Sequence, residues 1–306
     1  EGYEGLPSGS WHRVSDGHAV GGTRPDLFKL SFWLGEGEAR SSDSPRLSNP
    51  LDVEVLSSSP RGHFGQKGTV VFLHGAGGSA QRYNKLWKRG GIDLPSGFTI
   101  AFVQSARGNF GRRLKTPWTI PSKKWRMHLK TVEAQADDDV DILKLVLKQL
   151  AQEAGGYSKL WLSGRSQGGC LSTLLAVAGV APTVAGCFAI ASTALPELQH
   201  IPVGVDTYSL PSEKKLENLR LGFFSGSKDH QFTGHHPQNR IHGTFPLLKK
   251  TLVDLGFRPG FWLKEGAGHS GIGPTARNGD AFKVMFAWIQ GQDPANAGVA
   301  GVRAWP

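Results

Sequence analysis

The chain has 306 residues, a net charge of +10 and a mean hydropathy of −0.27. This length suits one large α/β domain or two small ones, and 39% hydrophobic with 20% charged residues is typical of a globular protein. No apolar run approaches the ~18 residues that a membrane helix needs. No targeting segment is visible, so we expect a location in the cytoplasm or inside an organelle.

The basic residues are scattered along the chain and are not joined to any nucleic-acid-binding motif. They occur in short groups, at 85–89, 112–115 and 123–126. We therefore expect no nucleic-acid partner and interpret the excess as a solvated basic surface. An anionic membrane surface or an acidic partner is the second interpretation.

The two cysteines, Cys170 and Cys187, are too few for a disulfide scaffold. Both lie in apolar runs that are typical of core elements, so we expect buried free thiols.

Residues 1–66 are rich in glycine, serine and proline and are interpreted as an N-terminal extension. Two segments inside it, 27–34 and 51–56, have the composition of strands and predict an edge hairpin. We assign 67–291 to one main domain and 292–306 to a C-terminal tail.

From residue 69 onward, continuous apolar runs alternate with helical patterns. Such runs are typical of strands buried on both faces of a parallel sheet. The predicted strands are 69–75, 98–104, 159–163, 184–192, 219–226 and 260–266. The apolar spacing after 140, after 170, near 248–255 and at 282–289 predicts helices between and after them. This alternation predicts a mostly parallel sheet covered by helices on both faces.

A serine flanked by glycines follows the third of these strands, in Gly164-Arg165-Ser166-Gln167-Gly168. The pattern Gly-x-Ser-x-Gly between a strand and a helix is the nucleophile elbow, a turn so tight that larger side chains beside the serine would clash. The helix after it directs N–H groups and a positive dipole end toward the serine. We therefore predict that Ser166 is a nucleophile and not merely a polar turn residue.

A nucleophilic serine needs a base and an acid that orients the base, in the chain order serine, acid, histidine. Asp229 stands just beyond the strand "LGFFSG", where the acid is expected, whereas Glu265 is expected to be structural. His269 lies in the glycine-rich loop "EGAGHSG" after the last strand and is the predicted base. The histidines near Asp229, at 230, 235, 236 and 242, have no metal-ligand spacing, so we predict no metal.

An oxyanion hole is expected from two backbone N–H groups. One belongs to Gln167, and the other to Ala76 in the loop "HGAGGS" after the first predicted strand. We expect His74 to hold this loop. A phosphate-binding interpretation of "GAGG" is weaker because the full dinucleotide-binding spacing is absent.

Together these motifs resemble those of the acyl-protein thioesterases, a family that also contains small carboxylesterases and lysophospholipases. The stretches that carry the resemblance lie within 69–290 and are "VVFLHGAGGS", "GRSQGG", "VAGCFAIASTALP", "FFSGSKDHQF" and "GAGHS". The resemblance implies an α/β-hydrolase fold and a cofactor-free serine hydrolase. Its implied substrates are acyl groups on protein cysteines or small esters and thioesters, cleaved through an acyl-enzyme. We assign Gly75, Arg165 and Trp125 to substrate binding.

The chain also departs from the family pattern. Arg165 stands where an apolar or small residue is usual, and "HQF" follows Asp229 where a Val-Pro pair is usual. The extension, the basic insertion at 108–124 and the tail are unmatched. Short-chain ester or lysophospholipid hydrolysis, and a secreted polyester or feruloyl-type esterase, remain alternatives. So does a non-catalytic subunit that uses the unmatched segments to dock in a larger complex.

Overall fold

The computed structural model describes residues 10–13, 26–32, 51–57, 64–75, 78–104, 143, 146–177, 184–192, 219–233, 245–254, 256–273 and 279–306. Within this part of the chain, ten strands form one sheet in the order β1-β2-β3-β5-β4-β6-β7-β8-β9-β10. Six neighbouring strands, from β5 to β9 in this order, run parallel. They are β5 (Phe98–Val103), β4 (Gly68–Leu73), β6 (Leu160–Arg165), β7 (Gly186–Ile190), β8 (Arg220–Gly226) and β9 (Gly260–Lys264). These six are the strands that the apolar runs predicted.

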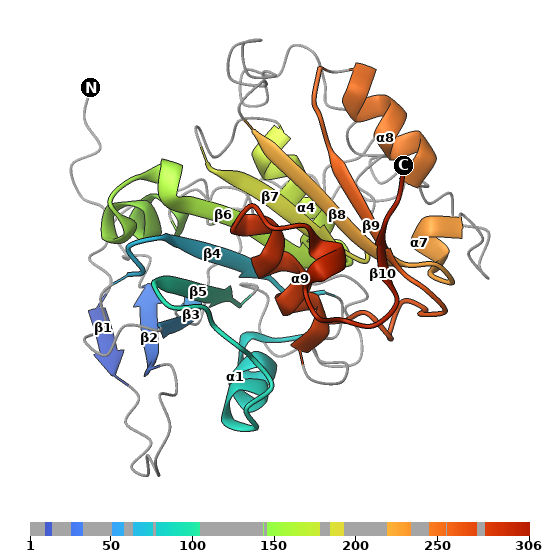
Figure 1. Cartoon of the computed structure of the whole chain (residues 1–306). Helices are drawn as coiled ribbons and strands as arrows, with labels where there is room; N and C mark the ends of the chain where they lie inside the picture. Colours follow the sequence, from blue (N-terminus) through green and yellow to red (C-terminus); the bar gives the residue numbers. More distant parts are fainter. Residues whose placement is uncertain are drawn as a thin grey trace, which may run out of the picture.

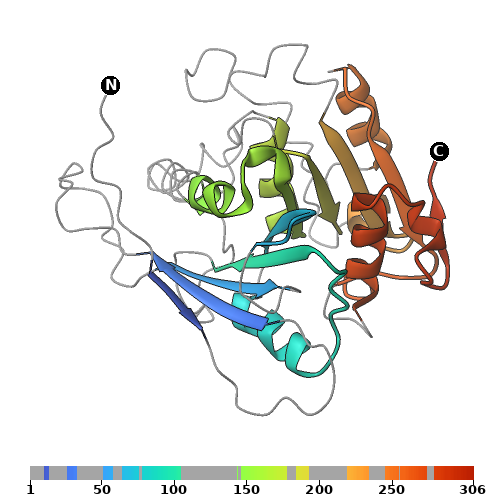
Figure 2. The ribbon, with the colours of Figure 1, turned by 60° about the vertical axis from the view of Figure 1, so that its left-hand side comes forward.

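Antiparallel strands extend the sheet at both edges. β1 (Ser10–Arg13), β2 (Asp26–Phe32) and β3 (Leu51–Ser57) pair in sequence, and β3 joins them to β5. The segments expected as an edge hairpin are therefore β2 and β3. The sheet is twisted, and in Figure 2 β2 runs in a clearly different direction from β8 and β9.

The C-terminal segment, set apart above as a tail, packs on the opposite edge. It contains the short helix η3 (Pro294–Asn296) and β10 (Val302–Ala304), which pairs antiparallel with β9. The Trp305 N–H donates to the carbonyl of Phe261 at 2.8 Å, and the indole lies 5.5 Å from the Phe261 ring. The C-terminal segment is thus part of the sheet and its aromatic packing.

Helices cover both faces of the sheet, as the alternating pattern predicted (Figure 1). They are α1 (Ala80–Lys88), the helical residues 146–154, η1 (Tyr157–Lys159), α4 (Gln167–Val177), α7 (His230–Thr233), α8 (Phe245–Asp254) and α9 (Asp280–Ile289). No helix in the described part of the chain combines the length and hydropathy of a membrane-crossing segment.

Alternate residues of the central strands enter two separate cores. On β4, Val71 and Leu73 belong to a core that also contains residues of α4, α8 and 146–154, whereas Val70 and Phe72 belong to a core with residues of α1 and α9. All six residues of β4 and of β5 are buried, because each strand has helices on both sides. This packing makes the central strands a rigid base for the loops at their carboxyl ends.

Both cysteines are free, but they differ in burial. Cys187 on β7 is buried, and this burial raises the pKa of its thiol to about 12. Cys170 on α4 is only half-buried, so the expectation of two buried thiols was wrong for this residue. Cys170 packs against the core only in part, because it lies in the first turn of α4, one turn after Ser166. Its Sγ lies 2.9 Å from Ser192 Oγ.

Candidate active site

The turn between β6 and α4 holds Ser166 in a backbone conformation that side chains rarely adopt. Its φ is 52°, in the left-handed region, which costs an L-residue roughly 1–2 kcal/mol. The surrounding chain enforces this conformation. The Ser166 N–H donates to the Ile190 carbonyl at 2.8 Å, and its own carbonyl accepts from the Cys170 N–H at 3.0 Å. This conformation presents the serine at the carboxyl end of β6 and at the N-terminus of α4.

The glycines of the elbow are required by close backbone approach. A Cβ on Gly164 would overlap the backbone of Gly168, and a Cβ on Gly168 would overlap the carbonyls of Leu73 and His74. The start of α4 is thus pressed directly against the end of β4. The sequence pattern predicted this turn, and the structure gives its steric cause.

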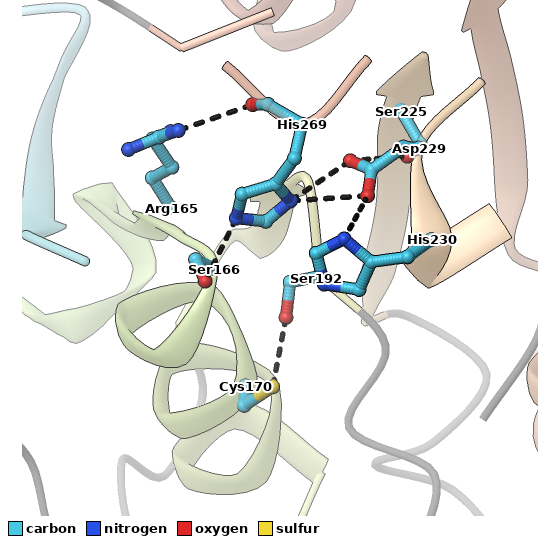
Figure 3. A network of polar contacts seen from close by, with 8 residues as sticks. All are labelled: Arg165, Ser166, Cys170, Ser192, Ser225, Asp229, His230 and His269. Atoms are coloured by element: carbon cyan, nitrogen blue, oxygen red, sulfur yellow. Dashed lines mark hydrogen bonds and ion pairs between the residues drawn. The ribbon is translucent and has the colours of Figure 1, made fainter. Parts of the chain in front are cut away.

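Ser166, His269 and Asp229 lie in one hydrogen-bonded line (Figure 3). The distance from Ser166 Oγ to His269 Nε2 is 3.2 Å, and His269 Nδ1 lies 3.0 Å from each carboxylate oxygen of Asp229. A proton on Nδ1 satisfies the carboxylate, and Nε2 is then the acceptor for the serine hydroxyl. This is the geometry of a nucleophile, a base and an orienting acid.

Asp229 is fully buried between strand β8 and helix α7. Ser225 Oγ donates to its Oδ2 at 3.2 Å, and His230 Nδ1 lies 3.5 Å from its Oδ1. Sequence reasoning did not identify Ser225. A serine inside the apolar run "LGFFSG", four residues before the acid, was the available signal.

His230, the first residue of α7, lies beside His269 and Asp229. Its ring centroid is 4.6 Å from that of His269. Among the described residues, the set Asp229, His230 and His269 brings metal-type ligand atoms within 4.8 Å of one another. A cation there would have to displace the proton that joins His269 to Asp229. Histidines 235, 236 and 242 lie outside the described residues.

Glu265, expected to be structural, is exposed and pairs with Arg303 on β10. Hydrogen bonds from Arg303 and then Ser227 lower the pKa of this carboxyl. Its ion pair with Arg303 joins the end of β9 to β10 at the edge of the sheet.

The structure describes one of the two expected oxyanion-hole residues, Gln167, and also Gly75, which precedes the other. Gln167 is the first residue of α4, and helix N-termini present backbone N–H groups to anions. A Cβ on Gly75 would lie 3.3 Å from Ser166 Cβ, so this loop touches the nucleophile. Ala76 and Trp125, predicted for the oxyanion hole and for substrate binding, lie outside the described residues.

His74 holds the loop, as the sequence suggested. Its Nδ1 lies 3.0 Å from the Gly75 carbonyl, and its Nε2 lies 3.4 Å from Gln104 Nε2. Because Gln104 Oε1 already accepts from the Ala80 N–H, its amide NH₂ faces His74. His74 therefore carries its proton on Nδ1 and donates it to Gly75. Burial lowers the pKa of His74, which favours this neutral form.

A scan against protein-family models and a search of curated protein sequences find no match for this chain. Solved structures do match. An acetyl xylan esterase from Paenibacillus sp. R4 matches with a TM-score of 0.54 at 14% identity, over 94% of this chain and 90% of the esterase. The chain has the α/β-hydrolase fold.

Two further solved structures are similar to this α/β-hydrolase chain. Esterase PE8 matches with a TM-score of 0.47 at 17% identity, over 75% of this chain and 94% of its own. An S-formylglutathione hydrolase from Agrobacterium tumefaciens matches with a TM-score of 0.46 at 15% identity, over 84% and 92%. The fold assignment rests on the acetyl xylan esterase match, and the chemistry is argued from the site.

Proposed function

We propose that this protein is a serine hydrolase that cleaves carboxylic esters or thioesters through an acyl-enzyme. The observation that carries the proposal is the contact line from Ser166 Oγ through His269 to the buried Asp229, with distances of 3.2 and 3.0 Å. The strained elbow and the N-terminus of α4 support it, because they place the serine where a developing oxyanion meets backbone N–H groups.

In the first half-reaction, Ser166 Oγ attacks the acyl carbon while His269 Nε2 takes its proton. The tetrahedral oxyanion is stabilised by the N–H of Gln167 and by a second N–H assigned to Ala76. The C–O or C–S bond then breaks, and His269 returns the proton to the leaving alcohol or thiol.

In the second half-reaction, water attacks the acyl-serine while His269 takes a proton from it. Ser166 leaves with that proton and the carboxylic acid is released. Asp229 orients His269 and stabilises its positive charge in both halves.

The substrate class follows from the sequence motifs, since "GRSQGG" and "GAGHS" resemble those of acyl-protein thioesterases. We therefore propose acyl groups on protein cysteines as the preferred substrate. The net charge of +10, together with the exposed Arg82, Lys85 and Arg89 on and after α1, supports work on an anionic surface. Turnover of p-nitrophenyl esters and acyl-peptide thioesters of increasing chain length tests this proposal. A preference for short oxygen esters would favour the carboxylesterase alternative.

Labelling with a fluorophosphonate probe tests the reaction type. The wild-type protein is expected to form a covalent adduct on Ser166, and Ser166→Ala is expected to form none while it folds normally. Full esterase activity in Ser166→Ala would contradict the proposal. No labelling of folded wild-type protein would favour a non-catalytic role in a larger complex.

A further inference from the structure

The side chain of Arg165 reaches from the nucleophile elbow to the loop that carries the base. Arg165 is the last residue of β6 and directly precedes Ser166. Its Nη2 donates to the backbone carbonyl of His269 at 3.1 Å. Figure 3 shows Arg165 and Asp229 on opposite sides of His269, so one holds the backbone and the other holds the ring.

The histidine loop is shaped around the guanidinium. A Cβ on Gly273 would lie 2.9 Å from Arg165 Nε, so the chain after His269 packs closely on this side chain. The Nε atom itself is buried and has no hydrogen-bond partner among the described residues. A buried donor without a partner costs roughly 1–3 kcal/mol. Stability alone therefore does not explain an arginine at this position.

The loop needs such a contact because it is rich in glycine. From Gly266 to Gly273 it contains four glycines, at 266, 268, 271 and 273. Before His269, the Ala267 carbonyl accepts from the Lys228 N–H at 2.9 Å. At His269 itself, the bond from Arg165 fixes the peptide plane from which the imidazole extends.

We propose that Arg165 is a positioning residue that couples the nucleophile to the base. Arg165 adjoins Ser166 in the chain and its side chain binds the His269 backbone. It therefore sets the distance between Ser166 Oγ and His269 Nε2. A misplacement of about 1 Å at this contact can cost about 100-fold in rate. This inference rests on the proposed serine-hydrolase function and differs from the substrate-binding role predicted for Arg165 from the sequence.

The experiment compares Arg165→Met, Arg165→Lys and Arg165→Ala with the wild-type protein on a neutral p-nitrophenyl ester. We expect kcat to fall about 10- to 100-fold in Arg165→Met, with KM changed by less than about 3-fold and fluorophosphonate labelling slowed in parallel. The kcat of Arg165→Lys should lie between those of the wild type and Arg165→Met. Free guanidinium should restore activity to Arg165→Ala, whereas urea, its neutral analogue of the same shape, should not.

Arg220→Met is a matched control in the same chain. Arg220 also donates to backbone carbonyls, those of Trp288 and Ile289, at 2.6 and 3.3 Å. It stacks on Trp161 and Trp288 at the other end of the sheet. We expect this variant to lose thermal stability and keep its kcat, whereas Arg165→Met keeps its stability and loses kcat.

A second readout does not depend on turnover. The His269 Nδ1 proton, held between the ring and Asp229, should give a downfield proton NMR signal in the wild type. This signal should broaden or shift in Arg165→Met and stay unchanged in Arg220→Met.

Wild-type kcat and an unchanged signal in Arg165→Met would overturn the inference. A raised KM for acidic esters alone, with kcat unchanged, would overturn it in favour of substrate binding. If the wild type shows the downfield signal but neither labels nor hydrolyses esters, the proposed function fails. The Arg165→Met spectrum then still decides whether Arg165 positions His269.

Discussion

The backbone N–H of Lys228 donates to the carbonyl of Ala267 at 2.9 Å and joins the loop that carries the acid to the loop that carries the base. The Ser227 N–H likewise donates to the backbone carbonyl of Lys264 at 3.0 Å, and Ser227 Oγ accepts from the Gly266 N–H at 2.9 Å. Asp229 and His269 are 40 residues apart in sequence, yet these bonds hold their loops as one unit.

The backbone strain at Ser166 should lower the free energy of unfolding for residues other than glycine at this position. Because its φ is 52°, Ser166→Gly should be more stable than Ser166→Ala by about 1 kcal/mol, although both lack the nucleophile. Urea unfolding of the two variants measures this difference. The same pair of substitutions at Ser158, an exposed residue of η1 without positive φ, should show the opposite order or no difference. Equal stability of the two Ser166 variants would mean that the elbow is not strained.

Asp229→Asn should lower kcat by about 10³- to 10⁴-fold, because an amide can hold the imidazole in the wrong tautomer and cannot stabilise its positive charge. Ser225→Ala should cost much less, since it removes a single hydrogen bond to Oδ2. Steady-state kinetics on a p-nitrophenyl ester measures both. The control is Asp254→Asn, which changes an exposed carboxylate of α8 that pairs with Lys250 one turn earlier. An Asp229→Asn variant with nearly full kcat would assign the acid elsewhere.

Gly168 and Gly256 should respond differently to alanine. At Gly168 an added Cβ overlaps the Leu73 and His74 carbonyls, so Gly168→Ala should destabilise the protein by about 3 kcal/mol or more and abolish fluorophosphonate labelling. Gly256 has a φ of 88° and open space around its Cβ position, so Gly256→Ala should cost only about 1 kcal/mol and label normally. Calorimetry together with labelling separates the two. Normal labelling of Gly168→Ala would contradict the close contact between β4 and α4.

His74 should contribute to acid sensitivity. Burial lowers its pKa below the ordinary value of 6.5, so the unfolded chain binds a proton that the folded protein does not. The stability that depends on neutral His74 is therefore complete above about pH 6.5 and is lost as the pH falls toward its lowered pKa. The free energy of unfolding should fall more steeply below that pH in the wild type than in His74→Gln. Parallel curves for the two proteins would contradict this assignment.

Much of this architecture could be predicted from local patterns. The strands β4 to β8 are apolar runs that are buried along nearly their whole length, and such runs stand out in a sequence. In β9 only Phe261 and Leu263 are buried. Ser166 could be predicted as a nucleophile because a tight strand-to-helix turn demands glycine at fixed positions beside it. Asp229 and His269 followed from their places after the last two parallel strands.

Other features depend on contacts between distant segments and left no local pattern. β10 reads as a tail of small residues and becomes a strand only because β9 offers an unpaired edge. Arg165 was predicted to contact the substrate, and its hydrogen bond to the His269 carbonyl, 104 residues away, could not be predicted from the sequence.

The sequence by itself determined which residue types stand at the carboxyl ends of the parallel strands, because hydrophobic periodicity and glycine spacing are local properties. Only the tertiary structure decided how they meet. The sheet order places β6, β7, β8 and β9 side by side and parallel. The loops after β6, β8 and β9 therefore converge at the carboxyl ends of these strands. Hydrogen-bond distances there depend on backbone contacts across the sheet, and a one-dimensional pattern does not record them.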